Sequence, residues 1–376
     1  MENIALVHDW LTTYGGQEAI VNVLFGLWPN MPVYTIIYDE EGECKNIVEG
    51  HEVYTSFIQK LPLAKRKYRT YLPLMPLAIE QLDVTGYDVV LSTHHAVSKG
   101  VLTTADQLHI SYVNTPIRYA WNLYHEYMRD GFQGKISAGL ARLVLHYIRI
   151  WDQQTANRVD VFIGNSHNVA NRIWRVYRRK AEVIYPPVEV DKFQPASKKD
   201  DYYVTFSRLV PYKRVDLVVE AFTKMGKPLV VLGDGPDADK IKAIAGSNIE
   251  FLGYQPDDVV VDVLGRAKAL VFAANEDFGI TPVEGQASGC PVIAYGRGGA
   301  LETVIDRETG LFFNEQTPQS LIKAVEEFEN IQKNFKIEKL RYNASRFSTD
   351  RFKQEYEDLV NSSYDKFLRG ELRSSD

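Results

Sequence analysis

Residues 269–299 constrain the fold most, because two short apolar runs enclose a loop and a short helix-like stretch. The first run, residues 269–272, is typical of a buried parallel strand, and residues 291–295 repeat the pattern. Between the two runs, Thr281 and Pro282 are typical of an N-cap and a first helical residue. This order of strand, loop, helix and strand predicts an α/β domain built on a parallel sheet.

The loop before this helix carries groups that suit a phosphorylated sugar. A helix N-terminus offers unpaired N–H groups and a positive dipole end, and Gly279 allows a ligand to approach the backbone closely. Glu276 precedes the helix and Glu284 lies about one turn inside it. Each glutamate alone would be an ordinary surface residue, but their spacing around this turn favours a joint role.

This stretch resembles the signature of retaining glycosyltransferase family 4, in which two glutamates separated by seven residues lie on a GT-B fold. The resemblance implies that Glu284 binds the ribose hydroxyls of a nucleotide-sugar donor, and that Glu276 binds hydroxyls of the transferred sugar. It also implies that backbone groups of four residues line the diphosphate and the sugar. These residues are Phe278, Gly279, Ile280 and Thr281.

A second loop, after the apolar run 202–206, carries Arg208 and Lys213. Arginine can bind phosphate with two parallel hydrogen bonds, while lysine acts as a point charge. The resemblance implies that these two residues, rather than the adjacent Arg214, neutralise the leaving diphosphate. No metal and no cofactor are then expected, because the two cations and the helix N-terminus supply the positive charge.

Two further features of this half of the chain bear on ligands. The resemblance implies that Gly253 and Tyr254, at the exit of the strand 249–254, hold the nucleotide base through backbone contacts. Asp237 and Asp239 have the spacing of a metal-binding pair, but they fall at a predicted helix start, where acids favour the dipole. We therefore expect no metal site there.

The chain begins with a predicted strand over residues 3–8, a loop ending in Gly15 and Gly16, and a helix. This is the opening of a doubly wound fold, in which ligands bind at the carboxyl ends of the strands. In family 4, a Gly-Gly pair followed by a glutamate, here Glu18, lies beside the donor phosphates. The alternative interpretation is a tight turn without a ligand.

The strand 88–92 is followed by His94 and His95. The segment resembles a His-Ala-x-x-Lys-Gly pattern of polysaccharide-assembly members of family 4, which indicates His95 near the transferred sugar or the acceptor hydroxyl, with Lys99 beside it. His94 remains the alternative. Other polar and aromatic residues follow the strand 108–113 and suit a sugar site. These acceptor-side candidates are Arg118, Tyr119 and Trp121.

A basic segment stands out in residues 54–82, interleaved with leucines and tyrosines. Its basic residues are Lys60, Lys65, Arg66, Lys67 and Arg69. Such a segment can lie on an anionic membrane surface, or it can be a solvated helix face backed by core residues. Both interpretations stay open from the sequence.

Pro186 and Pro187 indicate a linker, since consecutive prolines exclude helix. We predict an acceptor domain over residues 1–187, a donor domain over 188–346 and a crossover helix over 347–376. The net charge of −6 argues against nucleic-acid binding, and two cysteines indicate a reducing compartment. Because no apolar run reaches about 20 residues, we expect a cytoplasmic protein, either free or peripheral on the inner face of the plasma membrane.

The fold class expected is α/β of the GT-B type, with two doubly wound Rossmann-like domains facing an interdomain cleft and a C-terminal helix crossing back to the first domain. The resemblance implies metal-independent transfer of a hexose, with retention, from a UDP-glucose or GDP-mannose type of donor to a hydroxyl of a glycan or lipid-linked glycan in surface polysaccharide assembly. The residues expected to act in the reaction are Glu276, His95, Arg208 and Lys213. A sugar-nucleotide epimerase and a non-catalytic nucleotide-sugar-binding protein are the alternatives.

Overall fold

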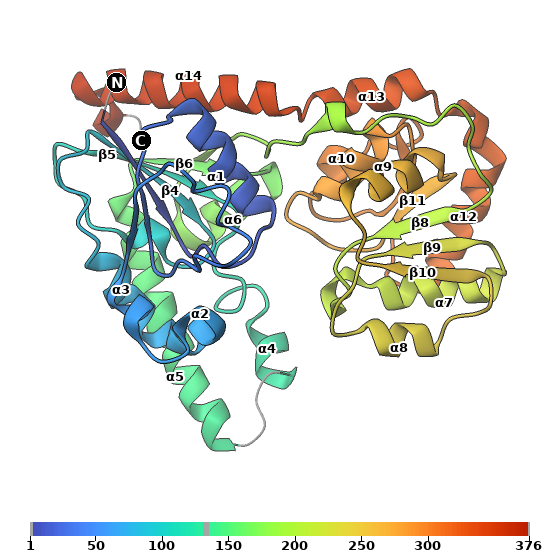
Figure 1. Cartoon of the computed structure of the whole chain (residues 1–376), viewed down its shortest axis with the longest axis horizontal. Helices are drawn as coiled ribbons and strands as arrows, with labels where there is room; N and C mark the ends of the chain where they lie inside the picture. Colours follow the sequence, from blue (N-terminus) through green and yellow to red (C-terminus); the bar gives the residue numbers. More distant parts are fainter. Residues whose placement is uncertain (1–2, 131–134, 375–376) are drawn as a thin grey trace. The chain divides into compact units, whose positions relative to one another are not determined.

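The computed structural model describes residues 3–130 and 135–374, and the chain divides into two units (Figure 1). The first unit comprises Met1–Tyr185 and Phe352–Asp376, and the second comprises Pro186–Arg351. These divisions fall close to the boundaries predicted at residues 187 and 346.

The first unit contains a seven-stranded sheet in the order β3-β2-β1-β4-β5-β6-β7, with all neighbours parallel. Its strands are β1 (Ile4–His8), β2 (Val33–Thr35), β3 (Val53–Thr55), β4 (Val89–His94), β5 (Leu108–Val113), β6 (Val161–Gly164) and β7 (Ala181–Val183). The order reverses between β1 and β4, where His8 pairs with Thr93. Ligands of doubly wound sheets bind at such a reversal, beyond the carboxyl ends of the strands.

Helices cover both faces of this sheet because alternate residues of a strand point to opposite sides. Ile4 and Leu6 of β1 pack in one cluster with α1 and α14, whereas Ala5 and Val7 pack in another with α2 and α3. The helices of the unit are α1 (Gly16–Leu27), α2 (Ala64–Lys67), α3 (Met75–Glu80), α4 (Tyr124–Asp130), α5 (Lys135–Thr155), α6 (His167–Tyr177) and α14 (Thr349–Leu368).

The last helix, α14, belongs to the first unit from Phe352 onward, although the second unit precedes it in the chain. Phe352, Tyr356 and Val360 are buried in the core of the first unit, and Leu359 and Tyr364 pack against that core. This confirms the predicted apolar face of the C-terminal helix and its return to the first domain.

The second unit contains a six-stranded parallel sheet in the order β10-β9-β8-β11-β12-β13. Its strands are β8 (Tyr203–Phe206), β9 (Leu229–Leu232), β10 (Ile249–Gly253), β11 (Ala269–Phe272), β12 (Val292–Tyr295) and β13 (Gly310–Phe313). Here the order reverses between β8 and β11. The loops after these two strands carry Arg208, Lys213 and Glu276.

The helices of the second unit are α7 (Val215–Met225), α8 (Ala238–Ala243), α9 (Asp257–Arg266), α10 (Ile280–Ala287), α11 (Ala300–Thr303), α12 (Pro318–Ile331) and α13 (Ile337–Ser345). Phe222 of α7 and Phe328 of α12 pack in one core cluster against the sheet. Elsewhere in the unit, a buried amide network joins α10 to α13. In this network Asn343 Nδ2 donates to Gln286 Oε1 at 2.6 Å, and both amides donate to the carbonyl oxygen of Thr303. Both units are Rossmann-like, which confirms the predicted α/β class.

Candidate functional site

The helix α10 begins earlier than the sequence predicts. Gly279, rather than Thr281, is its N-cap, and Ile280 is its first residue. Gly279 has a φ of 89°, a backbone conformation that glycine adopts readily and that is strained for threonine. The free N–H groups of the first turn therefore follow directly on the glycine, beside the loop that carries Glu276.

The glycine turn after β12 supports this loop. The N–H of Gly299 donates to the carbonyl oxygen of Glu276 at 2.9 Å. A Cβ atom on Gly299 would lie 2.1 Å from the carbonyl oxygen of Phe278, and one on Gly298 would lie 2.3 Å from that of Glu276. The two glycines are thus required by close backbone packing, which holds the Glu276 loop in place.

Lys213 and Glu276 meet at the reversal of the second sheet. Lys213 lies in a single 3₁₀ turn (Pro211–Lys213) after β8, while Glu276 follows β11. Their side chains form an ion pair and are 16% and 18% exposed. Arg208 lies two residues after the end of β8 and is exposed, whereas Arg214 forms an ion pair with Asp216 at 3.3 Å. The structure therefore brings together Lys213 and Glu276, two of the residues predicted to act in the reaction.

The loops after β8, β9 and β10 pack against one another through glycines. The N–H of Gly233 donates to the carbonyl oxygen of Gly253 at 2.8 Å. A Cβ atom on Gly233 would lie 1.9 Å from the carbonyl oxygen of Ser207. Gly253 and the 85% exposed Tyr254 consequently share this edge of the sheet with the Arg208 loop. Within the described residues, no three His, Cys, Asp or Glu side chains group together as metal ligands would.

Glu284 lies in the second turn of α10, and its carboxyl group forms no hydrogen bond or ion pair with any residue that the structure describes. Burial raises the pKa of Glu284 to about 7, although the positive charges of Lys192 and Lys213 act in the opposite direction. A partly buried carboxyl group without a partner is available to hydroxyl donors of a ligand.

The raised pKa predicts a pH-dependent loss of stability that Glu284→Gln should remove. Between the ordinary value of 4.5 and about 7, the folded protein holds a proton that the unfolded chain releases. The contribution of Glu284 to the free energy of unfolding therefore falls as the pH rises through this window, by at most about 3 kcal/mol.

Chemical denaturation of the native protein and of Glu284→Gln, below about pH 5 and above about pH 8, measures this contribution. We expect the variant to gain stability relative to the native chain as the pH rises. The same pH dependence in both proteins would contradict the raised pKa of Glu284.

In the first unit, Asp9 and His95 form a pair at the reversal between β1 and β4. The ring nitrogen Nδ1 of His95 lies 2.7 Å from Asp9 Oδ2. The Asp9 carboxylate also accepts four backbone N–H groups, at 2.6 to 3.0 Å, from the turn formed by residues 95–98. Sequence reasoning missed Asp9. Its local signal was an acidic residue directly after the first strand.

This pair fixes the orientation of the imidazole. Burial alone would raise the pKa of Asp9, but its contacts with His95 and the charges of the neighbouring histidines hold that pKa well below its usual range. The ring of Trp10 packs edge-on against the His95 ring with centroids 4.4 Å apart. The side chain of His95 is 19% exposed, and its Nε2 makes no hydrogen bond within residues 3–130 and 135–374. Nε2 is thus the ring nitrogen that remains available to a ligand.

Gly15 and Gly16 lie at the same edge of the first sheet, where Gly15 caps α1 and Gly16 is its first residue. Glu18 in the first turn is buried, and its Oε1 lies 3.4 Å from Nε2 of His8 at the end of β1. The Nδ1 atom of His8 in turn lies 2.6 Å from Thr93 Oγ1. The predicted Gly-Gly-Gln-Glu turn is therefore anchored to the ends of β1 and β4, next to the Asp9–His95 pair.

Lys99 is not at the surface, contrary to the acceptor-side role expected for it. Its side chain is completely buried, and Nζ donates to Thr155 Oγ1 at 2.7 Å and contacts Asp152 Oδ1 at 2.9 Å. The short 3₁₀ turn that follows His95 directs the lysine inward, where Asp152 of α5 neutralises it. Burial lowers the pKa of Lys99, and the contact with Asp152 offsets part of this effect.

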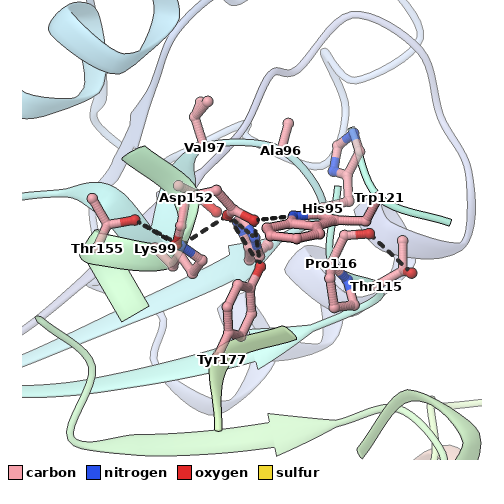
Figure 2. Close-up of polar contacts among 12 residues, drawn as sticks. His95, Ala96, Val97, Lys99, Thr115, Pro116, Trp121, Asp152, Thr155 and Tyr177 are labelled. Atoms are coloured by element: carbon pink, nitrogen blue, oxygen red, sulfur yellow. Dashed lines mark hydrogen bonds and ion pairs between the residues drawn. The ribbon is translucent and has the colours of Figure 1, made fainter. Parts of the chain in front are cut away.

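Two other groups share the Asp152 carboxylate (Figure 2). The indole Nε1 of Trp121 donates to Oδ2 at 2.7 Å, and the Tyr177 hydroxyl donates to Oδ1 at 3.0 Å. His94 is also buried here, with Nε2 3.8 Å from Oδ1. The polar atom of Trp121 is therefore engaged inside the unit, and of the two histidines only His95 is partly exposed.

Arg118 and Tyr119 follow β5 and are each only partly exposed. The ring centroids of Tyr119 and Tyr127 lie 6.1 Å apart. Burial raises the pKa of the Tyr119 hydroxyl. Their predicted role on the acceptor side stays a prediction.

The sequence over residues 188–347 matches the family model described as Glycosyl transferases group 1. The D-inositol 3-phosphate glycosyltransferase of Mycobacterium leprae is 27% identical over 187 residues, covering 43% of this chain and 44% of that protein. An uncharacterized glycosyltransferase of Methanocaldococcus jannaschii is 30% identical over 178 residues, covering 46% of this chain and 50% of that protein. The chain thus spans half or less of the length of these curated relatives.

Solved structures resemble the chain over nearly its whole length. Anabaena HepE in complex with UDP-glucose has a TM-score of 0.68 at 16% identity and covers 96% of this chain and 100% of that one. Sucrose-phosphate synthase from Thermosynechococcus elongatus has a TM-score of 0.73 at 15% identity, and the match covers 97% of this chain and 99% of that one. At such identities the likeness concerns the fold alone, and it confirms the predicted GT-B class.

Proposed function

We propose that this protein transfers a hexose from a nucleoside-diphosphate sugar to a hydroxyl of a glycan acceptor, because residues 188–347 match the family model described as Glycosyl transferases group 1. The observation that carries the proposal is the arrangement at the β8–β11 reversal. There the Lys213–Glu276 pair lies beside the start of α10, which also carries the unpartnered Glu284.

In this proposal the donor lies along the start of α10. The carboxylate of Glu284 accepts hydrogen bonds from the ribose hydroxyls, and the backbone around Phe278, Gly279, Ile280 and Thr281 binds the diphosphate and the sugar. Gly253 and Tyr254 hold the base at the neighbouring edge. The ion pair of Lys213 and Glu276 separates as the donor enters, so that the lysine meets the diphosphate and the glutamate meets sugar hydroxyls.

Negative charge on the leaving diphosphate is the principal demand of such a transfer. Arg208, Lys213 and the N-terminus of α10 meet this demand without a metal ion, because each places positive charge where the leaving oxygens develop theirs. The leaving phosphate takes the proton of the acceptor hydroxyl on the same face of the sugar, which retains the anomeric configuration. His95 Nε2 contributes from the acceptor side, and no cofactor takes part.

We further propose a donor of the UDP-glucose or GDP-mannose type and a growing surface polysaccharide, free or lipid-linked, as the acceptor. The likeness to HepE, whose structure contains UDP-glucose, supports the first donor. Such an enzyme would work in the cytoplasm, at the inner face of the plasma membrane.

The proposal is tested by a thermal-shift screen of UDP, GDP and ADP sugars, followed by product analysis with and without glycan acceptors. The expected result is a stabilising donor and a glycoside product whose anomeric configuration, measured by NMR, matches the donor. An epimerised sugar nucleotide formed from the donor alone would identify an epimerase instead. Donor binding without any product would indicate a non-catalytic binding protein.

Replacing Glu284 by alanine is expected to weaken donor binding, because it removes the charged acceptor of the ribose hydroxyls. A hydrogen bond to a charged group contributes about 1.5–3 kcal/mol, so Kd for the nucleoside diphosphate should rise by roughly 10- to 150-fold. Calorimetric titration measures the change, with Glu302→Ala on α11 as the control. An unaltered Kd would remove Glu284 from the donor site.

A further inference from the structure

The helix α5 has a buried apolar face and an exposed one. Leu145, Ile148 and Trp151 are buried against the first unit. Four other apolar residues of the same helix are exposed. These are Leu140 at 64%, Leu143 at 69%, Tyr147 at 48% and Ile150 at 47%, together called the α5 stripe. An exposed apolar strip of this kind marks a binding surface when it is continuous.

The α5 stripe is continuous and bordered by basic groups. At about 100° per residue its four members fall within an arc of about 80°. Arg142 and His146, both exposed, lie along one border of the arc, and residues 135–151 contain no Asp or Glu. An apolar strip with a basic border is the pattern of helices that lie in the interface of an anionic membrane.

The basic segment 60–69 lies beside α5 in the same unit. Leu72, which follows this segment, packs into the cluster that contains Leu145 and Ile148 of α5. Figure 1 shows α2, which lies within this segment, and α3, which follows it, on the same end of the unit as α5. Residues 54–79 contain no Asp or Glu, although the whole chain has a net charge of −6. The basic segment and the described part of α5 are thus positively charged within an acidic protein, although Asp39 and Glu40 both contact Lys65.

The basic segment and the nearby helix α3 also expose apolar groups. Leu63 in the segment is 60% exposed, and Leu77 on α3 is 49% exposed. Leu63 has a φ of 55°, a conformation that is strained for leucine, and this strain occurs where its side chain points to solvent. Arg66, Lys67 and Arg69 form no ion pair with any residue that the structure describes, whereas Lys65 lies 3.9 Å from Asp39.

Aromatic contacts connect this segment to the Asp9–His95 pair. The guanidinium of Arg69 lies 5.0 Å from the centre of the Tyr68 ring. The Tyr68 and Trp10 rings have centroids 4.9 Å apart, and Trp10 and His95 have centroids 4.4 Å apart. A chain of ring contacts through Tyr68 and Trp10 therefore links the basic segment to His95.

We propose that the α5 stripe and the basic segment 60–69 together form a docking surface for an anionic lipid bilayer. The stripe enters the interface between headgroups and acyl chains, while Arg66, Lys67 and Arg69 contact anionic headgroups. No described helix is long and apolar enough to cross a membrane, and the attachment is of the interfacial kind. Docking itself is independent of the proposed function. The corollary that His95 receives a lipid-presented acceptor rests on that function.

A second copy of this chain is the competing occupant of the stripe. Two α5 helices facing each other would bring Arg142, His146 and their counterparts together without any acidic residue from this helix to neutralise them. The charge around the stripe therefore favours an anionic partner over self-association.

The experiment is co-sedimentation of the full chain with phosphatidylcholine vesicles that contain or lack phosphatidylglycerol, at low and high salt and without any sugar nucleotide. We expect binding only to the anionic vesicles, weakened by salt. The charge variant Arg66→Gln/Lys67→Gln/Arg69→Gln should lower the partition coefficient by about tenfold or more. The stripe variant Leu140→Gln/Leu143→Gln/Ile150→Gln should lower it to a similar degree.

Matched controls carry equal changes on the second unit. Lys240→Gln/Lys323→Gln/Lys333→Gln removes the same charge, and Ile244→Gln/Leu301→Gln/Ile337→Gln removes similar exposed apolar area. Both should bind vesicles as the native chain does. Thermal unfolding followed by circular dichroism, without any nucleotide, shows for every variant that the fold is intact and keeps this test separate from that of the proposed function.

Failure of the native chain to sediment with anionic vesicles would overturn the proposal. Equal losses in the controls and in the two test variants would do the same, since the effect would then not belong to this face. Light scattering on the same samples detects self-association. A dimer that the stripe variant dissociates, with vesicle binding unchanged, would assign the stripe to a second copy of the chain.

Discussion

Replacing Lys213 by alanine is expected to lower turnover by about 10²-fold or more, as the loss of a preorganised charge at a developing anion does. Lys213 lies at the reversal between β8 and β11 and is held there by Glu276. In the proposed reaction its charge would stabilise the leaving diphosphate most strongly when the bond to the sugar breaks. Arg208→Ala should lower turnover to a comparable degree, because Arg208 lies in the same loop and would bind the same diphosphate.

The measurement is the turnover number and KM for the donor, with Arg214→Gln as the control. Arg214 is adjacent in sequence but is ion-paired with Asp216, so its replacement should leave turnover close to the native value. Equal losses in Lys213→Ala and Arg214→Gln would contradict the assignment. Full recovery of both Lys213→Ala and Arg208→Ala on adding magnesium would indicate a metal-based mechanism.

Replacing His95 by alanine is expected to lower turnover by about 10²-fold or more, in the range of a lost acid–base group. Asp9→Asn should lower it by about 10- to 100-fold, because Asp9 acts through the orientation of the imidazole. The side-chain amide of this variant cannot accept all the backbone hydrogen bonds that the Asp9 carboxylate accepts. A backbone N–H group is then left unsatisfied, which lowers the free energy of unfolding by about 1–3 kcal/mol.

Three measurements separate orientation from stability. We expect turnover of Asp9→Asn to fall at temperatures where circular dichroism shows a folded chain, with Kd for the nucleoside diphosphate unchanged. His94→Ala should lose stability through a cavity, since His94 is completely buried, and keep most of its turnover. A larger loss of turnover in His94→Ala than in His95→Ala would reverse the roles of the two histidines.

The architecture was predictable because each short apolar run marks a buried parallel strand, and the glycine-containing loop after it marks the carboxyl end of that strand. The meeting of Lys213 and Glu276 was within reach for the same reason, since both follow strands at one edge of one sheet. Asp9 was missed because recognising it requires knowing that β1 and β4 are neighbours, which is a property of strand order and not of local sequence.

The placement of Lys99 could not be derived from its spacing to His95. Its direction depends on a three-residue 3₁₀ turn, and its partner Asp152 lies on a helix more than fifty residues later. The start of α10 was misplaced because Thr281 and Pro282 have the composition of a helix start, while the φ of Gly279 determines the actual cap. Both cases depend on backbone geometry that residue types alone do not specify.

At the position of the unpartnered Glu284 carboxyl group, selection for stability and selection for donor binding favour different residues. Without a ligand, this side chain makes the folded chain less stable at neutral pH than a neutral residue of the same shape would. Random variants screened only for heat resistance should therefore accumulate substitutions at position 284, and the survivors should bind donor poorly. Screening in the presence of a saturating nucleoside diphosphate should keep the glutamate, because the bound ligand then contributes the stability that the empty site lacks.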